Sequence, residues 1–205
     1  MNGYHLRFAL AWLVIAGIGC TSAPVHYYTL APPPNKTGRD SETTPAIDVR
    51  ILHAPPQLNR SELVVRTGAT EVMLLENERW ASPVNDEIKD AVRLELQRSL
   101  RRTTGSRPFT KLTLDIDVQQ FEAEFGRHAL LEASWSATLS ATGPRSNGAI
   151  ATTCTFHADE KIHSGYAEIV EGYQRAIAAL ADAIVAVLTN LASGVDASCQ
   201  KYTDH

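Results

Sequence analysis

The sequence has little that would support catalysis or metal binding. It contains no Gly-x-Ser-x-Gly elbow, no phosphate-binding loop and no Cys-x-x-Cys pair, and its seven histidines do not have the His-x-x-x-His spacing of a helical metal site. His157 and His163 flank Asp159 and Glu160 in what we expect to be a solvated, charged loop. We therefore expect neither an enzyme nor a metal site. A hydrolase or inhibitor with an unrecognised site is the remaining catalytic alternative.

An excess of basic residues is also missing. The chain has 19 Lys and Arg against 23 Asp and Glu, a net charge of −4, and the charges are spread along it without long runs of one sign. This distribution excludes the basic footprint of a nucleic-acid-binding protein. With 44% hydrophobic and 20% charged residues the composition is that of an ordinary folded domain.

The apolar run near the N-terminus is too short to stay in a membrane. It covers residues 8–18, follows Arg7 and spans about eleven residues, whereas a transmembrane helix needs roughly 20. A basic start, a short apolar run and then small residues are typical of a secretion signal. The signal ends at Gly19, and Cys20 follows in a segment, residues 16–20, that resembles a bacterial lipobox. The alternative is a plain secreted protein cleaved near Ala23.

Lipidation would attach diacylglycerol and an N-acyl chain to Cys20, and no other cofactor is expected. Each buried methylene of these chains contributes roughly 0.8 kcal/mol, so two or three chains anchor a protein stably. Thr21 follows the cysteine in place of the aspartate that retains such proteins in the inner membrane. We therefore expect a protein held at the periplasmic face of the outer membrane.

The remaining chain has the length of one domain, which we place at residues 26–205 behind a tether at residues 20–25. A Pro-rich segment, residues 32–46, is expected to be a flexible loop that serves as a tether or a docking arm, and residues 195–205 form a C-terminal tail. Strand composition or alternation predicts strands at residues 26–30, 47–52, 62–66, 71–75, 111–118, 131–139 and 150–156. The hydrophobic phase changes near Gln119-Gln120, which indicates a β-bulge.

Two segments have helical periodicity. Ser82 is the expected N-cap of the first helix, with Pro83 at its first position and an apolar stripe from Val84 to Leu100. The second runs from Tyr166 to Ser193, with Gly194 as its C-terminal cap. The order of elements predicts an α+β fold, a two-layer sandwich of a mostly antiparallel or mixed β-sheet with two amphipathic helices packed on one face.

Several segments together resemble the PqiC/YmbA family, the outer-membrane lipoproteins that serve as auxiliary components of transport systems built around MCE-domain proteins. The resemblance runs in order along the mature chain, through residues 27–30, 47–66, 78–83 and 121–135. It implies a lipoprotein that forms homo-oligomeric rings and docks a periplasm-spanning MCE tube, together with its inner-membrane partner, at the outer membrane. Such a protein would support lipid transport between the membranes and hence envelope integrity.

Three features keep two interpretations each. Cys154 and Cys199 could form a disulfide in the oxidising periplasm, although Cys154 could equally be a buried free thiol. Arg79-Trp80 could contact a partner, or Trp80 could close the core with Arg79 packed over it. The domain could dock a transport tube, or it could itself carry a hydrophobic ligand.

Overall fold

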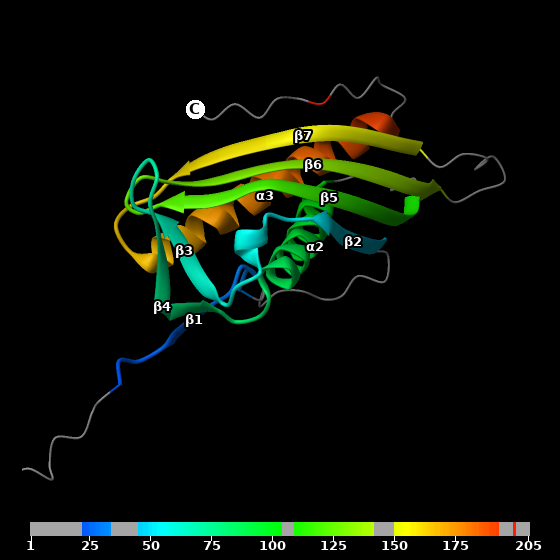
Figure 1. Cartoon of the computed structure of the whole chain (residues 1–205). Coiled ribbons are helices and arrows are strands. Elements are labelled where there is room, and N and C mark those ends of the chain that lie inside the picture. Colours follow the sequence, from blue (N-terminus) through cyan, green and yellow to red (C-terminus); the bar gives the residue numbers. More distant parts are fainter. Residues whose placement is uncertain (1–21, 34–44, 104–108, 142–149, 193–198, 200–205) are drawn as a thin grey trace, which may run out of the picture.

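The computed structural model describes residues 22–33, 45–103, 109–141, 150–192 and 199. Among these residues it contains one mixed sheet and two helices, which confirms the expected α+β class (Figure 1). The strands are β1 (His26–Tyr28), β2 (Ala46–His53), β3 (Glu62–Arg66), β4 (Val72–Trp80), β5 (Phe109–Glu124), β6 (His128–Ala141) and β7 (Ile150–Lys161). The helices are α2 (Val84–Arg102) and α3 (Tyr166–Ala192), and a single 3₁₀ turn, η1, covers Pro56–Leu58.

The three longest strands form the antiparallel meander β5-β6-β7, which ends at one edge of the sheet. The alternating residues of β5 that were expected to point inward are fully buried, among them Leu112, Leu114 and Ile116. The β5–β6 register shifts between Val118 and Gln120, which confirms the predicted bulge. Because of this shift, Phe121 faces the same core as Val118 although it lies an odd number of residues further on.

β5 is long enough to have two different neighbours on its other side. Its first half pairs in parallel with β2, and its last residue, Glu124, pairs with Arg66 of β3. β3 and β4 form the predicted antiparallel hairpin, and β1 adds to β4 in parallel through residues 78–80. The sheet order is therefore β1-β4-β3-β5-β6-β7, with β2 beside the first half of β5.

The N-cap of helix α2 lies one residue later than expected, at Pro83 instead of Ser82. Pro83 occupies the cap position, and its carbonyl accepts hydrogen bonds from the backbone N–H groups of Asp86 and Glu87. The prediction that Ser82 caps the helix is wrong, because its hydroxyl donates to the Glu87 carboxylate at 2.7 Å instead. The apolar stripe from Val84 to Leu100 is buried as predicted.

Helix α3 is the central element of the helical layer and contacts α2, β6 and β7. Residues 166–191 are long and apolar enough to cross a membrane by composition, with a mean hydropathy of 1.3, but 44% of that window is buried inside the protein. Its apolar stripe from Ile169 to Leu188 is buried against α2 and the sheet, so the helix packs as part of the core. The expected cap at Gly194 lies outside the described residues.

The two helices lie on the same side of the sheet, as Figure 1 shows. The opposite side carries polar residues from the central strands, including the ion pair between Arg50 of β2 and Asp115 of β5, whose Nε and Oδ1 atoms are 2.6 Å apart. The predicted two-layer arrangement, with one covered and one open sheet face, is confirmed.

Candidate functional site

Trp80, the last residue of β4, belongs to the core. Only 6% of it is exposed, and its ring lies 6.3 Å from the rings of both Phe121 and Tyr173. Phe121 and Tyr173 are stacked, with ring centroids 3.8 Å apart. This aromatic cluster joins β4, β5 and α3 at one point. Of the two interpretations of Trp80, the structure supports the one in which it closes the core.

Arg79 does not pack over Trp80, because consecutive residues of a strand point to opposite faces. Its Nε donates to the carbonyl of Glu76 at 3.1 Å, and its Nη2 lies 3.6 Å from Glu62 Oε1. The side chain remains 38% exposed. Arg79 thus stays a candidate for partner contact, whereas Trp80 does not.

A pocket of about 320 Å³ opens where β3 diverges from β5. Of the described residues, only Arg66 and Glu124 are paired between these strands, so the rest of β3 leaves a split beside Phe121 and Ala123. The ion pair between Arg66 Nη2 and Glu122 Oε2, at 2.7 Å, spans this split. The pocket is lined mainly by apolar side chains and has the aromatic cluster as its floor.

A second depression, of about 470 Å³, adjoins the first. The two share the lining residues Leu58, Arg60, Trp80 and Val84. The second is the more polar by residue type, since Asn59, Ser61, Ser82 and Asn85 also line it. Sequence reasoning missed both depressions, because they arise from the divergence of two strands that only the fold brings together.

Two glutamates, Glu78 and Glu87, form the hydrogen bonds that hold β1 and the residues after it beside this site. Glu78 Oε2 accepts a 2.6 Å hydrogen bond from the Tyr28 hydroxyl, and Glu78 Oε1 lies 3.0 Å from His26 Nδ1. Burial, together with this bond and the charge of Glu78, raises the pKa of Tyr28 to about 12. Burial also acts to raise the pKa of Glu78, but the hydrogen bonds from Tyr28 and His26 outweigh it, so that pKa lies below its ordinary value.

Glu87 fastens the chain just after β1. Only 6% exposed, it accepts hydrogen bonds from the Thr29 hydroxyl and the Leu30 N–H, both at 2.8 Å, and from the Ser82 hydroxyl. In the sequence Glu87 is a first-turn acid of α2, a position that indicates only an interaction with the positive end of the helix dipole. Its position four residues after Pro83 gave no signal that it would bind a segment almost sixty residues earlier.

Cys20, the candidate lipid-attachment residue, lies outside the described residues. Its distance from the described domain is nevertheless limited, because His26, where β1 begins, is the sixth residue after Cys20. A fully extended chain spans about 3.4 Å per residue, so His26 lies within about 20 Å of Cys20.

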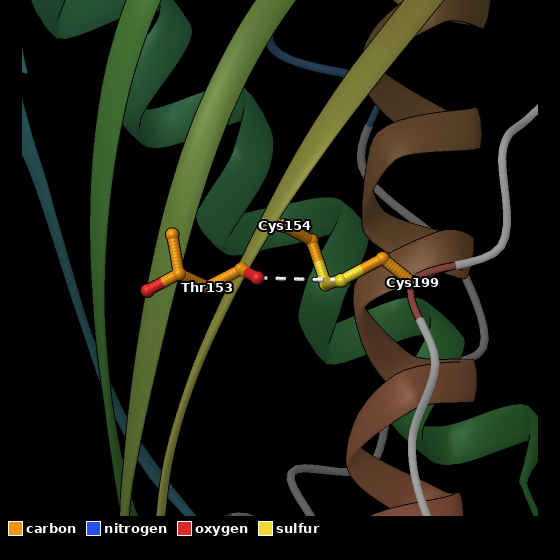
Figure 2. Close-up of a disulfide and its surroundings, with 3 residues drawn as sticks. All are labelled: Thr153, Cys154 and Cys199. Carbon is orange, nitrogen blue, oxygen red and sulfur yellow. Dashed lines mark hydrogen bonds between the residues drawn. A yellow bond between two sulfur atoms is a disulfide. The ribbon is translucent and has the colours of Figure 1, made fainter.

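Cys154 of β7 and Cys199 are bonded through their sulfur atoms, with their Cα atoms 5.5 Å apart (Figure 2). The Cys199 sulfur also lies 3.3 Å from the carbonyl oxygen of Thr153. The disulfide holds Cys199 against the edge strand of the sheet and closes a stretch of 45 residues that includes all of α3.

The charged residues around His157 form part of a strand, so the prediction that they lie in a loop is wrong. β7 continues to Lys161, and its polar side chains have cross-strand partners: His157 lies 2.8 Å from Glu132, and Asp159 lies 3.0 Å from His128. These pairs allow the strand to continue through a polar sequence. In the described part of the chain, no three His, Cys, Asp or Glu residues gather as metal ligands would.

The fold and the site define a small α+β domain with a pocket beside its first strand. A short segment joins that strand to Cys20. Residues 28–185 match the family model of the ABC-type transport auxiliary lipoprotein component, and the chain belongs to that family. The family consists of envelope lipoproteins that serve transporters and is not one of enzymes. No curated protein matches the chain.

One solved structure shares the fold, and two others match more weakly. One, described as a crystal structure of an uncharacterized protein, matches with a TM-score of 0.58 at 18% identity, covering 80% of this chain and 98% of the other. A protein from Xanthomonas campestris, of the family model DUF330, matches at TM-score 0.45 and 14% identity over 74% and 88% of the two chains. A candidate lipoprotein from Caulobacter crescentus matches at TM-score 0.37 and 16% identity over 52% and 84%.

Proposed function

We propose that this protein is an outer-membrane-anchored lipoprotein subunit of an MCE-type intermembrane lipid transport system. It docks the periplasm-spanning MCE tube at the outer membrane, supports envelope integrity and has no enzymatic activity. The observation that carries the proposal is the family match over residues 28–185, directly behind a lipobox-like segment ending at Cys20. Acyl chains at Cys20 provide the anchor.

The short connection makes this anchor restrictive. With His26 within about 20 Å of Cys20, the start of β1 stays close to the bilayer surface whatever path the chain takes. The contacts of Tyr28 with Glu78, and of Thr29 with Glu87, transmit this restriction to the whole domain. A domain held in this way suits a stationary docking element better than a carrier that must cross the periplasm.

An apolar strand supplies a candidate docking surface for the tube or for neighbouring copies of the chain. Val72, Met73 and Leu74 of β4 are 58%, 49% and 42% exposed. β1 pairs only with residues 78–80 of β4, so among the described strands this stretch is paired on one side alone, through β3. A strand that is paired on one side only and has exposed apolar side chains is suited to contact another protein.

The test is affinity purification of the full-length protein from native membranes in mild detergent. An MCE-domain protein is expected to co-purify with the wild type and with Thr138→Asp, a substitution at an exposed position of β6. Met73→Asp should lose the partner while it retains the fold by circular dichroism. Purification of the wild type without any MCE-domain protein would overturn the docking function.

A second candidate function is that the domain itself carries a hydrophobic ligand. The pocket beneath the β3–β5 split favours it, because its aromatic floor is accessible through an opening in the sheet. Mass spectrometry of the protein released from membranes, searching for non-covalently bound lipid, tests this function separately from docking.

A further inference from the structure

The two depressions beside β1 form one site with an apolar and a polar end. They share Arg60 and Trp80 as part of a common wall. Their volumes, about 320 and 470 Å³, lie within the range of about 300–1,000 Å³ that is typical of small-molecule sites. A ligand that occupies both ends must itself be amphipathic.

The apolar end is suited to a hydrocarbon chain. Leu63, Ile169 and Val84 line it above the aromatic floor of Phe121 and Tyr173. The Tyr173 phenol is neutral at physiological pH, and burial raises its pKa still further above its usual range, so the floor carries no charge. An uncharged surface of this kind gains free energy when an apolar chain displaces water from it.

The polar end has one buried group that lacks a partner in the described part of the protein, and a cationic side chain lies beside it. The Asn85 Oδ1 atom is buried without a hydrogen-bond partner, although buried polar groups are normally satisfied. Arg60 is exposed in the wall that both depressions share, and its positive charge helps to lower the pKa of Glu62. The amide oxygen needs a hydrogen-bond donor, and the exposed guanidinium is available to an anion. A phosphate ester that also carries a hydroxyl or ammonium group supplies both.

The location of the site indicates where such a ligand would come from. Trp80, in the wall shared by both ends, pairs with Tyr28 of β1, which is eight residues from Cys20. An anchored chain therefore holds the site within about 30 Å of the bilayer surface by chain length alone. Tyr27 and Val25, 66% and 41% exposed, add apolar surface to the same segment, and tyrosine is favoured at the membrane interface.

We propose that this site binds a glycerophospholipid, with one acyl chain between β3 and β5 over the aromatic cluster and the phosphate head against Arg60 and Asn85. The proposal deepens the second candidate function and does not require the docking function. A lipid is favoured over an apolar peptide because the site combines an apolar, aromatic floor with an exposed cationic side chain, Arg60, and lies close to the bilayer.

Contact between a lipid chain and Trp80 can be measured by bromine quenching of indole fluorescence. The full-length protein, purified from membranes, is reconstituted into vesicles of dioleoylphosphatidylcholine and di(9,10-dibromostearoyl)phosphatidylglycerol. After signal removal the chain retains only Trp80 and Trp135, and Trp135 lies in the core on β6, where 2% of it is exposed. Most of the Trp80 emission should be lost, and the remaining Trp135 emission in Trp80→Phe should not be quenched.

Matched variants separate the two ends of the site. Val64→Phe narrows the mouth of the pocket from a half-buried position and should restore Trp80 emission several-fold, whereas Thr138→Phe on the same sheet face should leave the quenching unchanged. A second set of vesicles carries the bromine on phosphatidylcholine in place of phosphatidylglycerol. The wild type should be quenched more strongly by brominated phosphatidylglycerol, and Arg60→Gln should reduce this difference. Equal quenching in Val64→Phe and the wild type would contradict the pocket as the site.

The anchor and the site can fail separately in this experiment. A protein that sediments with the vesicles while Trp80 remains bright overturns the lipid site and leaves the anchor intact, as an apolar peptide occupant would predict. If the protein does not sediment, dibromostearoyl-lysophosphatidylglycerol is added to it below the micelle concentration. Saturable quenching of Trp80 then supports the site, and its absence overturns it.

Discussion

The hydroxyl of Tyr28 on β1 donates a hydrogen bond of 2.6 Å to Glu78 on β4. This bond joins the strand that follows the proposed anchor to the strand that ends in the aromatic cluster. A force applied at the N-terminus is therefore transmitted to the sheet. The contribution of this hydrogen bond to stability can be measured directly.

Tyr28→Phe should lower the free energy of unfolding at neutral pH by about 1.5–3 kcal/mol, because it removes a hydrogen bond to a charged carboxylate. The wild-type contribution also depends on pH. Since the folded-state pKa of Tyr28 is raised to about 12, its contribution is full below the unfolded value of about 10 and is lost as the pH rises through 12. Urea unfolding at pH 7, 10 and 12 measures both effects.

Glu78 gives the opposite dependence on pH. Its folded-state pKa is lowered, so its contribution is present above the unfolded pKa of about 4.3 and is lost as the pH falls through the folded value. Glu78→Gln should therefore flatten the acid limb of the stability profile. Parallel acid limbs in the two proteins would contradict the role given to this carboxylate.

Glu87→Ala should be more damaging than its neighbour Asp86→Ala. Glu87 is buried and accepts from three donors, whereas Asp86 is exposed and pairs only with Lys89, at 2.6 Å. We expect a loss of about 2–4 kcal/mol for Glu87→Ala and under about 0.5 kcal/mol for Asp86→Ala. Hydrogen exchange should locate the difference in residues 26–33, and equal protection there would refute the assignment.

Gly172 allows α3 to approach the sheet closely. A Cβ atom at this position would lie 2.6 Å from Ile162 Cγ2 and 2.9 Å from the Ala129 Cβ. Gly172→Ala should therefore lower the free energy of unfolding by about 1–2 kcal/mol, even though alanine favours a helix by nearly 1 kcal/mol. At Gly68 a Cβ would meet nothing within 4 Å, so Gly68→Ala is the control, and chemical denaturation compares them.

The disulfide should stabilise the domain through the 45-residue separation of Cys154 and Cys199. Closing a loop of this length restricts the unfolded chain, and the expected gain is about 2–4 kcal/mol. Cys199→Ser, at the exposed partner, should show this loss and should become insensitive to dithiothreitol. Equal unfolding midpoints for the oxidised and reduced wild type would show that the bond does not contribute.

Local patterns predicted those parts of the fold that depend on local physics. Alternation in β5 gave both the buried face and the bulge at Gln119, because a strand with one buried face must follow period two and change phase where a residue is inserted. The α2 stripe was equally readable. The start of α2 was not predicted correctly, because the Ser82 hydroxyl donates to the side chain of Glu87, five residues further on, instead of capping the helix.

Long-range pairing could not be predicted in the same way. The polar end of β7 was expected to be a loop, since only the register with β6 shows that Glu132 and His128 pair with His157 and Asp159. The pocket depends on β3 leaving β5 after a single pair, Arg66 with Glu124, which no sequence pattern indicates. The candidate lipid residue, in contrast, was read from sequence alone and lies outside the described residues.

The measurement that tests the central claim most directly is metabolic labelling with alkyne-palmitate, followed by fractionation of the cell envelope. The wild-type protein should carry the label and sediment with the outer membrane, whereas Cys20→Ala should be unlabelled and absent from that fraction. An unlabelled wild-type protein that is recovered entirely in the soluble periplasmic fraction would contradict the anchor and, with it, the proposed docking function.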